Sequence, residues 1–475
     1  MRARLASTFA LVVLAAGCSV AEEPAKKQPP IEGPPAPKAL AQISGVTELE
    51  DINPDPDIVE VNLTAAPADM EIVSGHTTHM LSFNGSTPGP MLHARVGNRI
   101  IVHFQNNLAE PTTIHWHGLR ILPEMDGNPM VVAPIPAGGS FTYDFVAPDP
   151  GTFWYHPHVD TIEQIPRGLY APIVIEEKDA PVFTGERMHV IADTRLNASY
   201  QHDTFRTPMD MMMGRFGDRI LANGTTKPVG GTIARGAVER WRIVNVAPAR
   251  TMEIGVEGAS FRVIGTDGGL LPEPFTTNRL VVTVGQRYDL EVTADDPNAT
   301  EVKLVGHFPV QASNGTTKDQ VMPFAVYTVD GDVTAEPPVY PTVTLPELPP
   351  SFDERKLVLS DMQDAQGKVI MTMNGMDGMK LPMAEFTQGS PVRFTIKNSM
   401  MHAHPFHFHG QFFQILTRNG KPANEPGLKD VVFLDGMDTV TIATNFENPG
   451  EWMYHCHIAE HAEQGMMAEL MVSPP

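Results

Sequence analysis

Short runs in which apolar and polar residues alternate follow one another along the chain, separated by turn residues. Residues 99–104 (Arg-Ile-Ile-Val-His-Phe) and 140–145 (Ser-Phe-Thr-Tyr-Asp-Phe) are typical. This period of two favours half-buried β-strands. The 44 prolines and 39 glycines are spread along the whole chain and interrupt any helix-length pattern. The pattern therefore predicts an all-β protein.

The strand-like texture occurs in three successive units, and 475 residues are too many for one ordinary domain. The predicted domains are residues 45–178, 186–335 and 353–475, and a Pro-rich linker, 336–352, precedes the third. A glycine turn leads into a strand in each unit, at Gly97, Gly236 and Gly389. Repeated β units of this size fit Greek-key sandwiches.

The N-terminus has the pattern of an export signal. Arg2 and Arg4 precede an apolar run, residues 5–16, and small residues lead to Cys18. The segment ending at Cys18 resembles the signal of bacterial lipoproteins, and residues 19–44 have the composition of a flexible tether. We expect a protein on the periplasmic side of a bacterial cell envelope, in contact with the membrane only through lipid at Cys18.

Net charge and cysteine content limit the classes of molecule that the protein can bind. The net charge is -22, and no run of Lys and Arg occurs, which argues against a nucleic-acid partner. The acidic surface favours cations, or simply solubility. If Cys18 carries lipid, Cys456 has no partner for a disulfide, and a metal ion is the plausible occupant of that thiol.

The histidines are clustered, because ten of the 18 lie in four short segments. The clusters are His115 and His117; His156 and His158; His404, His407 and His409; His455, His457 and His461. Residues i and i+2 of a strand point to the same side, so each pair can present two imidazoles to one site. A single His-x-His pair is more often two surface or core histidines than a metal site. A structural zinc ion needs only four ligands, fewer than are clustered here. Ten clustered histidines with a thiolate therefore favour several metal ions.

Cys456 lies between His455 and His457, and strand alternation aims it to the opposite face. One strand would then join two metal sites. From Cys456 onward, His461 and Met466 add an imidazole and a thioether at short spacing. With one distant histidine, this is the His2Cys set with a weak axial Met that defines blue copper.

The four clusters resemble the copper-binding signatures of multicopper oxidases, in the same order along the mature chain. Residues 216–224 and 265–274 are similar to those of bacterial periplasmic copper-efflux (cuprous) oxidases and their laccase-like relatives. The resemblance implies three cupredoxin-like Greek-key domains with one type 1, one type 2 and two type 3 copper ions. It also implies one-electron oxidation of a reducing substrate, coupled to reduction of O2 to water.

The resemblance assigns ligands position by position. The blue (type 1) copper would be held by His404, Cys456, His461 and axial Met466. The type 2 copper would be held by His115 and His407. One type 3 copper would be held by His117, His156 and His457, and the other by His158, His409 and His455.

The resemblance also places an acid after the first cluster, matched by Asp126, which we expect in the proton relay. A plain turn at Asp126-Gly127 is the alternative. Cuprous relatives usually carry Glu directly after the final histidine ligand, whereas this chain has Ala462. This departure puts their second proton path in doubt, with Glu463 as a substitute to be considered.

The 26 methionines indicate the substrate. They gather at residues 209–213, at 362–383 and at Met400-Met401, just before His404. Thioethers select Cu(I), although methionine also fills gaps in cores. We therefore expect a monomeric oxidase of Cu(I) that serves copper tolerance. A laccase-like oxidase of phenols and aromatic amines is one alternative, and a non-catalytic copper-binding or scaffold protein is another, although the complete ligand set argues against it.

Overall fold

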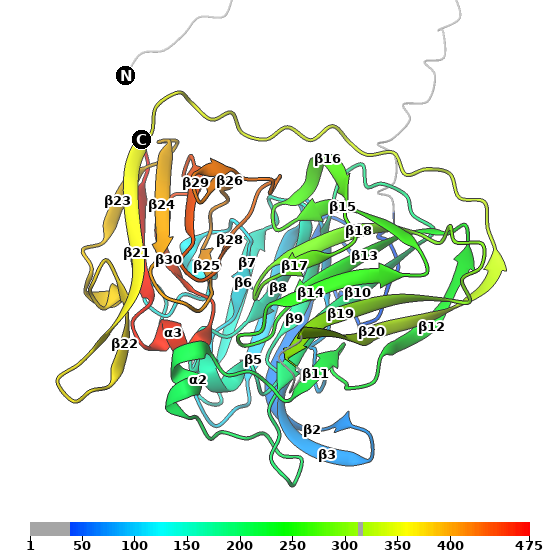
Figure 1. Ribbon diagram of the computed structural model, residues 1–475, viewed down its shortest axis with the longest axis horizontal. Helices are drawn as coiled ribbons and strands as arrows, with labels where there is room; N and C mark the ends of the chain where they lie inside the picture. The colour runs from blue at the N-terminus through cyan, green and yellow to red at the C-terminus, as the bar shows by residue number, and fades with distance from the viewer. Residues whose placement is uncertain (1–38, 312–316) are drawn as a thin grey trace, which may run out of the picture. The chain divides into compact units, whose positions relative to one another are not determined.

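Strands make up nearly all the regular structure of the residues that the computed structural model describes, 39–311 and 317–475 (Figure 1). The helices are short: α1 (Thr161–Gln164), α2 (Pro208–Met213), α3 (Ala459–Glu463) and the 3-10 turns η1 (Pro123–Met125) and η2 (Gly378–Lys380). The predicted signal peptide and the tether up to residue 38, Cys18 included, lie outside the described residues. The end of the predicted tether, 19–44, is instead part of the fold, because Ile43 is buried and β1 (Ile43–Ser44) pairs with β10 (Gly185–Thr194).

The first sandwich packs the sheet β3-β2-β5-β7 against β4-β9-β8-β6. Its strands are β2 (Ile58–Val73), β3 (His76–Phe83), β4 (Leu92–Arg95), β5 (Arg99–Asn106), β6 (His115–His117), β7 (Ser140–Val146), β8 (Gly151–His156) and β9 (Ala171–Glu176). Phe104, Trp116 and Phe153 are buried in one core between the two sheets. Strands β6 and β8, which carry His115, His117 and His156, are neighbours at one edge of the second of these sheets.

The second sandwich packs β1-β10-β13-β18-β15-β16, with β11 beside β10, against β12-β20-β19-β14-β17. In one sheet are β1 (Ile43–Ser44), β10 (Gly185–Thr194), β11 (Arg219–Ala222), β13 (Val238–Asn245), β15 (Ser260–Thr266), β16 (Gly269–Thr276) and β18 (Arg287–Thr293). In the other are β12 (Val229–Arg235), β14 (Met252–Glu257), β17 (Leu280–Val282), β19 (Glu301–Gln311) and β20 (Thr317–Asp332).

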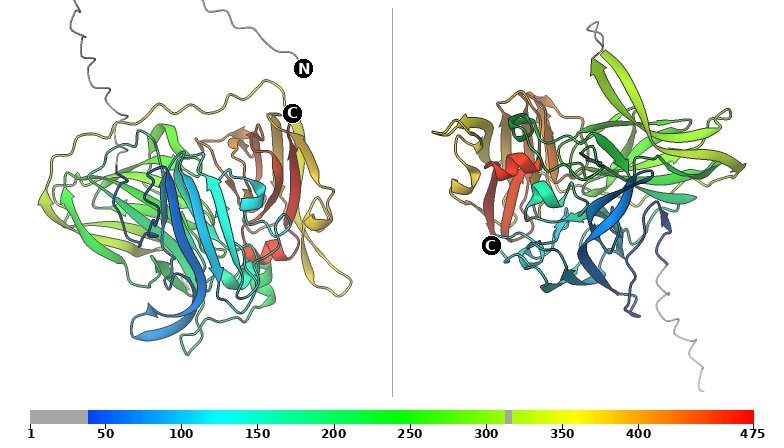
Figure 2. Two further views of the ribbon diagram at one scale, coloured as in Figure 1. Left: turned by 180° about the vertical axis from the view of Figure 1, so that it is seen from behind. Right: turned by 90° about the horizontal axis from the view of Figure 1, so that it is seen from below.

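The third sandwich packs β22-β21-β24-β29-β26-β27 against β23-β31-β30-β25-β28. In one sheet are β21 (Asp353–Gln363), β22 (Val369–Met373), β24 (Val392–Asn398), β26 (Gln414–Arg418), β27 (Lys421–Pro422) and β29 (Thr439–Thr444). In the other are β23 (Ala384–Thr387), β25 (His404–Phe408), β28 (Val431–Leu434), β30 (Gly450–Cys456) and β31 (Met467–Ser473). Figure 2 shows the blue-to-cyan, green and orange-to-red sandwiches from two further sides. The prediction of an all-β chain of three sandwiches is confirmed.

The weak internal repeat corresponds to the same strand in each sandwich. Strands β5, β13 and β24 each pair in parallel with an earlier strand (β2, β10, β21) and antiparallel with a later one (β7, β18, β29). The glycine before each strand has positive φ, which explains why glycine is needed in each turn. The glycine turns therefore mark one structural repeat, because each leads into the equivalent strand of its sandwich.

Each repeat strand ends in a fully buried asparagine, Asn106, Asn245 or Asn398. Its side-chain oxygen accepts the backbone N–H two residues on, and its amide donates to carbonyls of the following loop and of a distant segment. In the third sandwich the loop carbonyl is that of His402, at 2.8 Å, so Asn398 fixes the chain just before His404.

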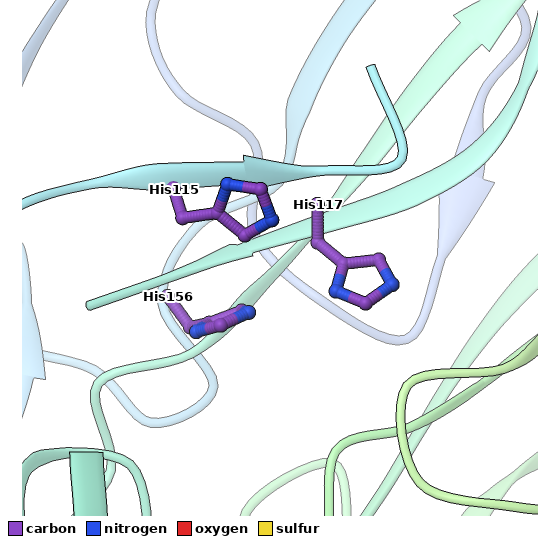
Figure 3. Close-up of side chains that lie close together, drawn as sticks. All are labelled: His115, His117 and His156. Atoms are coloured by element: carbon purple, nitrogen blue, oxygen red, sulfur yellow. The ribbon is translucent and has the colours of Figure 1, made fainter. Parts of the chain in front are cut away.

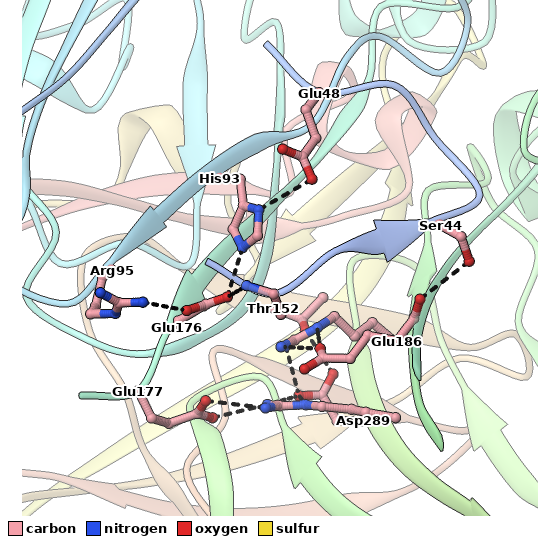
Figure 4. Close-up of polar contacts among 12 residues, drawn as sticks. Ser44, Glu48, His93, Arg95, Thr152, Glu176, Glu177, Glu186 and Asp289 are labelled. Atoms are coloured by element: carbon pink, nitrogen blue, oxygen red, sulfur yellow. Dashed lines mark hydrogen bonds and ion pairs between the residues drawn. The ribbon is translucent and has the colours of Figure 1, made fainter. Parts of the chain in front are cut away.

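Buried ion pairs join the first two sandwiches (Figure 4). Arg240 donates to Glu177, beyond β9, at 2.9 Å and to Asp289, in β18, at 2.6 Å. Arg242 donates to Thr152 of β8 at 3.0 Å. Burial opposes ionisation of Asp289, but the two guanidiniums lower its pKa below the ordinary value. Removing one partner would leave a buried charge unpaired, so these contacts fix how the two sandwiches meet.

We predict that Asn245→Ala lowers the free energy of unfolding by about 3 kcal/mol, because two carbonyls and one N–H lose their buried partners. Denaturant unfolding of the copper-free protein measures the change. Asn62→Ala, at an exposed strand position, is the control and should change stability by less than about 0.5 kcal/mol. Equal effects of the two substitutions would contradict the role of the buried asparagine.

Candidate metal centres

Three buried side chains of the third sandwich converge on one point. His404 begins β25, Cys456 ends β30 and His461 lies in α3. Cys456 Sγ is 3.4 Å from His404 Nδ1 and 3.5 Å from His461 Nδ1, and the two nitrogens are 3.1 Å apart. Two imidazole nitrogens and one sulfur form a trigonal set of the blue-copper type.

Met466 belongs to the same loop and is fully buried. Its N–H donates to the carbonyl of His461 at 3.0 Å, and its carbonyl accepts the N–H of Cys456 at 3.0 Å. These two hydrogen bonds fold the segment back on itself, so that Met466 lies beside the residues that carry the thiolate and the imidazole. Burial raises the pKa of the Cys456 thiol, and a metal ion would supply the positive charge that deprotonation needs.

Eight histidines form a second site between the first and third sandwiches. They are His115, His117, His156, His158, His407, His409, His455 and His457, and all are buried. Strand register brings them together, because His115 is paired with His156 across β6 and β8, and His407 with His455 across β25 and β30. Figure 3 shows that His115, His117 and His156 lie close together, and their ligand atoms are within 4.8 Å of one another.

The imidazoles of the two sandwiches interleave at this site. The rings of His115 and His409 stack with centroids 3.8 Å apart, as do those of His117 and His407. His409 Nε2 lies 3.0 Å from His455 Nε2. Ligand atoms of the predicted type 3 set His158, His409 and His455 lie within 4.8 Å of one another.

The second predicted type 3 set is also brought together. His457 Nε2 lies 3.3 Å from His117 Nδ1, and the ring centroids of His156 and His457 are 5.4 Å apart. The predicted type 2 pair, His115 and His407, has ring centroids 5.7 Å apart. The structure therefore gathers Cys456 and every predicted histidine ligand into one of two sites, and Met466 belongs to the same loop as His461. The division among individual copper ions stays a prediction.

Backbone carbonyls fix which ring nitrogen is free. Nδ1 of His115, His156, His407 and His455 donates to the carbonyls of Asp126, Pro157, Asp430 and Cys456 at 2.8–2.9 Å. The buried Nε2 atoms of His115, His156, His158 and His407 have no hydrogen-bond partner among the described residues. Such orphaned nitrogens are costly unless something binds them, and the donor set fits copper.

Burial keeps these imidazoles neutral, the form in which histidine binds metals. Burial first, and then neighbouring imidazoles, lower the pKa far below the ordinary value for His117, His156, His158, His404, His407, His409 and His457. Burial also lowers the pKa of His455 to about 4 and that of His461 to about 3.

Two carboxylates lie behind the histidine cluster. The predicted Asp126 is fully buried, and its Oδ2 accepts from His409 Nδ1 at 2.8 Å while Oδ1 is 3.2 Å from His115 Nδ1. Asp430 was missed. It lies 3.1 Å from His117 Nε2, and Arg287 holds both of its oxygens at 2.7 and 2.6 Å. A single Asp before β28 matches no motif of regular spacing. Its partners His117 and Arg287 come from the first and second sandwiches.

A cavity of about 50 Å³ touches the cluster from the side of α1 and α3. It is lined by His156, His158, His455, His457, Ala462 and Glu463, among others. This volume holds a water-sized molecule or two. Glu463, the substitute considered for the second proton path, therefore borders the cavity together with Ala462.

The outer edge of the blue site is covered by α2. His461 Nε2–H donates to the carbonyl of Met212 at 3.0 Å, and Gln464 donates to that of Met211. Figure 1 shows α2 beside α3 at the lower left. His402 adds a third imidazole, with a ligand atom within 4.8 Å of those of His404 and His461. Sequence patterns cannot indicate the α2 contact, because its acceptor is a backbone carbonyl.

Comparisons with known proteins agree with this geometry. Multicopper oxidase models match residues 64–180, 154–329 and 349–475. Multicopper oxidase MmcO of Mycobacterium tuberculosis is 28% identical, over 87% of this chain and 86% of that protein. Laccase-1 of Botryotinia fuckeliana is 28% identical, over 83% of this chain and 78% of that protein.

Solved structures show the same likeness. A multicopper oxidase from Campylobacter jejuni, described as a metallo-oxidase, is 26% identical and superimposes with a TM-score of 0.78 over 92% of this chain and 96% of its own. A multicopper oxidase from Pseudomonas thermotolerans is 29% identical, with a TM-score of 0.77 over 88% and 99%. The chain therefore belongs to the multicopper oxidase family, binds four copper ions and couples oxidation of a reducing substrate to reduction of O2 to water.

Proposed function

We propose that Cu(I) is the reducing substrate of this oxidase. The observation that carries the proposal is the cover of the blue site, where a helix of sequence Pro-Met-Asp-Met-Met-Met lies on His461. Thioethers bind Cu(I) in preference to harder ions, so this surface suits a soft metal ion. Both histidines of the blue site are fully buried, which leaves no open imidazole edge for a bulky phenol.

We assign the copper ligands as the family resemblance implies. His404, Cys456, His461 and axial Met466 would hold the type 1 copper, and His115 with His407 the type 2 copper. The type 3 ions would be held by His117, His156 and His457, and by His158, His409 and His455. When bound, these ions supply one-electron oxidation at the first site and reduction of O2 at the second.

The chain contributes the link between the two sites and a carboxylate beside the histidine cluster. Cys456 is bonded through its own peptides to His455 and His457, so one backbone segment connects the two centres. Asp126 lies against His409 and His115 from outside the cluster. We assign Asp126 to the proton relay because it is a carboxylate in direct contact with two of the cluster imidazoles.

Further methionines lie in and around η2, which contacts the loop that carries Met466. The N–H of Gly378, in η2, donates to the carbonyl of Gly465 at 2.7 Å, which holds η2 against the loop of Met466. Met376, just before η2, and Met379, in η2, are 43% and 38% exposed, and Met401 is 84% exposed. Sulfur is thus accessible next to the blue site, as capture of Cu(I) from solvent would need. Met400, in contrast, is buried in the core.

His402 adds a nitrogen to this surface. Its Nε2 is buried without a hydrogen-bond partner among the described residues, and its ring centroid lies 4.8 Å from that of His404. Burial lowers its pKa, which favours the neutral form that binds metals. We propose that His402 and the exposed thioethers together receive the substrate ion.

A laccase-like activity on phenols is the second candidate, supported by one cavity. It measures about 710 Å³ and begins at Phe216, three residues after α2. Phe216, Met252, Phe308 and Met322 give it apolar walls. A phenol would fit there, but the buried blue-site histidines place the Cu(I) proposal first.

We also propose that the protein is a monomer of the bacterial periplasm, anchored by lipid at Cys18, where it would protect against copper. The support is the N-terminal pattern of basic, apolar and small residues before Cys18. Within residues 39–311 and 317–475, no helix has the length and apolar character needed to cross a bilayer.

We predict that Cys456→Ser abolishes the blue absorption and the oxidase activity, because the thiolate is the source of the blue colour. The eight-histidine site should still bind copper, detectable as a type 2 signal by electron paramagnetic resonance. Circular dichroism of the variant should match the wild type. A colourless wild type fully loaded with copper would overturn the assignment of the blue site.

We predict that replacing Met376, Met379 and Met401 by leucine raises KM for Cu(I) by about tenfold or more. A tenfold change corresponds to about 1.4 kcal/mol of lost binding free energy. Leucine keeps the apolar volume and removes the sulfur, so activity on a dimethoxyphenol should change less than about twofold. Oxygen uptake with stabilised Cu(I) and with the phenol measures both. Met130→Leu, an exposed methionine of the first sandwich, is the control. Equal losses on both substrates would favour the laccase activity.

A further inference from the structure

We infer that the ion pair between Arg195 and Asp210 is a positioning device for the blue copper, because it holds α2 on His461 and so fixes the hydrogen bond on the outer nitrogen of that ligand. The inference rests on the proposed assignment of His461 to the blue copper. Neither residue touches a predicted copper ligand, and both belong to the segment that joins β10 to β11.

Helix α2 cannot hold this position by itself. It has six residues, too few for a stable isolated helix, and none of them is buried. Its hydrogen bonds to α3 and to the residue after α3 are made by the carbonyls of Met212 and Met211, which accept from His461 and Gln464. Gly214 and Arg215, directly after the helix, are buried and hold its end. The place of these carbonyls therefore depends also on whatever fixes the start of the helix.

Asp210 is the residue on which the start of α2 depends. Its Oδ2 accepts from the N–H of Thr207 at 2.7 Å and from Thr207 Oγ1 at 2.9 Å, while its own N–H donates back to Thr207 Oγ1 at 3.1 Å. This reciprocal capping box closes the first turn. Both oxygens of the same carboxylate also accept from Arg195, at 2.9 and 3.1 Å.

Arg195 connects this turn to a rigid element. It directly follows β10, a strand in the interior of the second sandwich. The guanidinium also donates to the carbonyl of Phe205 and lies 3.4 Å from Asp203, so it binds the segment before α2 as well as its first turn. Burial opposes ionisation of Asp210, but Arg195 and Thr207 lower its pKa to about 2, which keeps the pair charged near neutral pH.

The chain of contacts thus runs from β10 through Arg195 and Asp210 to α2, and from Met212 to His461 in the third sandwich. An acceptor on the outer nitrogen of a metal-bound imidazole fixes the ring and makes it a stronger donor to the metal. A stronger donor stabilises Cu(II) relative to Cu(I) and lowers the reduction potential. Loss of the Arg195–Asp210 pair should therefore raise the potential of the blue copper.

Two substitutions test this inference from different sides. Arg195→Met removes the ion pair and leaves the capping box, whereas Asp210→Asn keeps a side chain that can still accept from Thr207. Arg195→Lys is the conservative variant that keeps the charge. Asp144→Asn is the matched control, because Asp144 makes a similar two-point pair with Arg99, at 2.8 and 2.6 Å, in the first sandwich.

Hydrogen exchange of residues 203–214 in the copper-free protein reports on α2 without relying on activity. Redox titration and electron paramagnetic resonance of the copper-loaded protein report on His461. In Arg195→Met and Asp210→Asn we expect exchange to be at least about tenfold faster. We also expect a higher blue-copper potential and altered copper hyperfine splitting. Arg195→Lys should recover part of each change, and Asp144→Asn should show none.

Unchanged exchange in both variants would overturn the inference, since the pair would not hold α2. Faster exchange with unchanged potential and hyperfine splitting would also overturn it, because the pair would then only anchor a loop. His461→Ala separates this failure from that of the site assignment. If that variant keeps its blue absorption, the assignment of His461 to the blue copper fails, whatever the exchange of α2 shows.

Discussion

The organisation of the protein depends on the alternation of side chains at the end of β30. Cys456 points into the third sandwich, toward His404 and His461, while His455 and His457 point out of it, toward the first sandwich. One backbone segment must therefore satisfy two metal sites at once. A shift of one residue in register would exchange the thiolate with an imidazole at both sites, so the register of β30 against β25 and β31 must be specified strongly.

That register is secured by burial on both faces of the strand. Trp452 and Cys456 lie in the core of the third sandwich, and the imidazoles on the other side are buried against the first sandwich. The first sandwich supplies half of the histidine cluster, which means that the cluster exists only when the first and third sandwiches are docked. Copper that bridges their histidines would then stabilise the docking, since it binds the assembled site and not its separated halves.

The sequence was informative wherever the cause is local. Strand periodicity, the three glycine turns and the His-x-His pairs all arise within a few residues, and the corresponding strands and ligand clusters are found in the structure. Asp126 could be proposed because it follows a recognisable cluster. Asp430 could not, since its role depends on Arg287 from the second sandwich and His117 from the first. The same holds for Arg240, whose carboxylate partners come from two sandwiches.

The contact of α2 with His461 shows why contacts between distant segments cannot be predicted from sequence patterns. The methionines at 209–213 suggested sulfur chemistry, yet the contact with His461 is made by the peptide carbonyl of Met212. Any residue could supply that carbonyl, so no residue type marks it, and its position is set by the capping turn and by Arg195 fifteen residues before Asp210. Side-chain identity and backbone position thus make separate contributions at this edge. Under the proposed function the thioethers would bind the substrate, while the placement of α2 sets the hydrogen bond on His461, a proposed ligand of the blue copper.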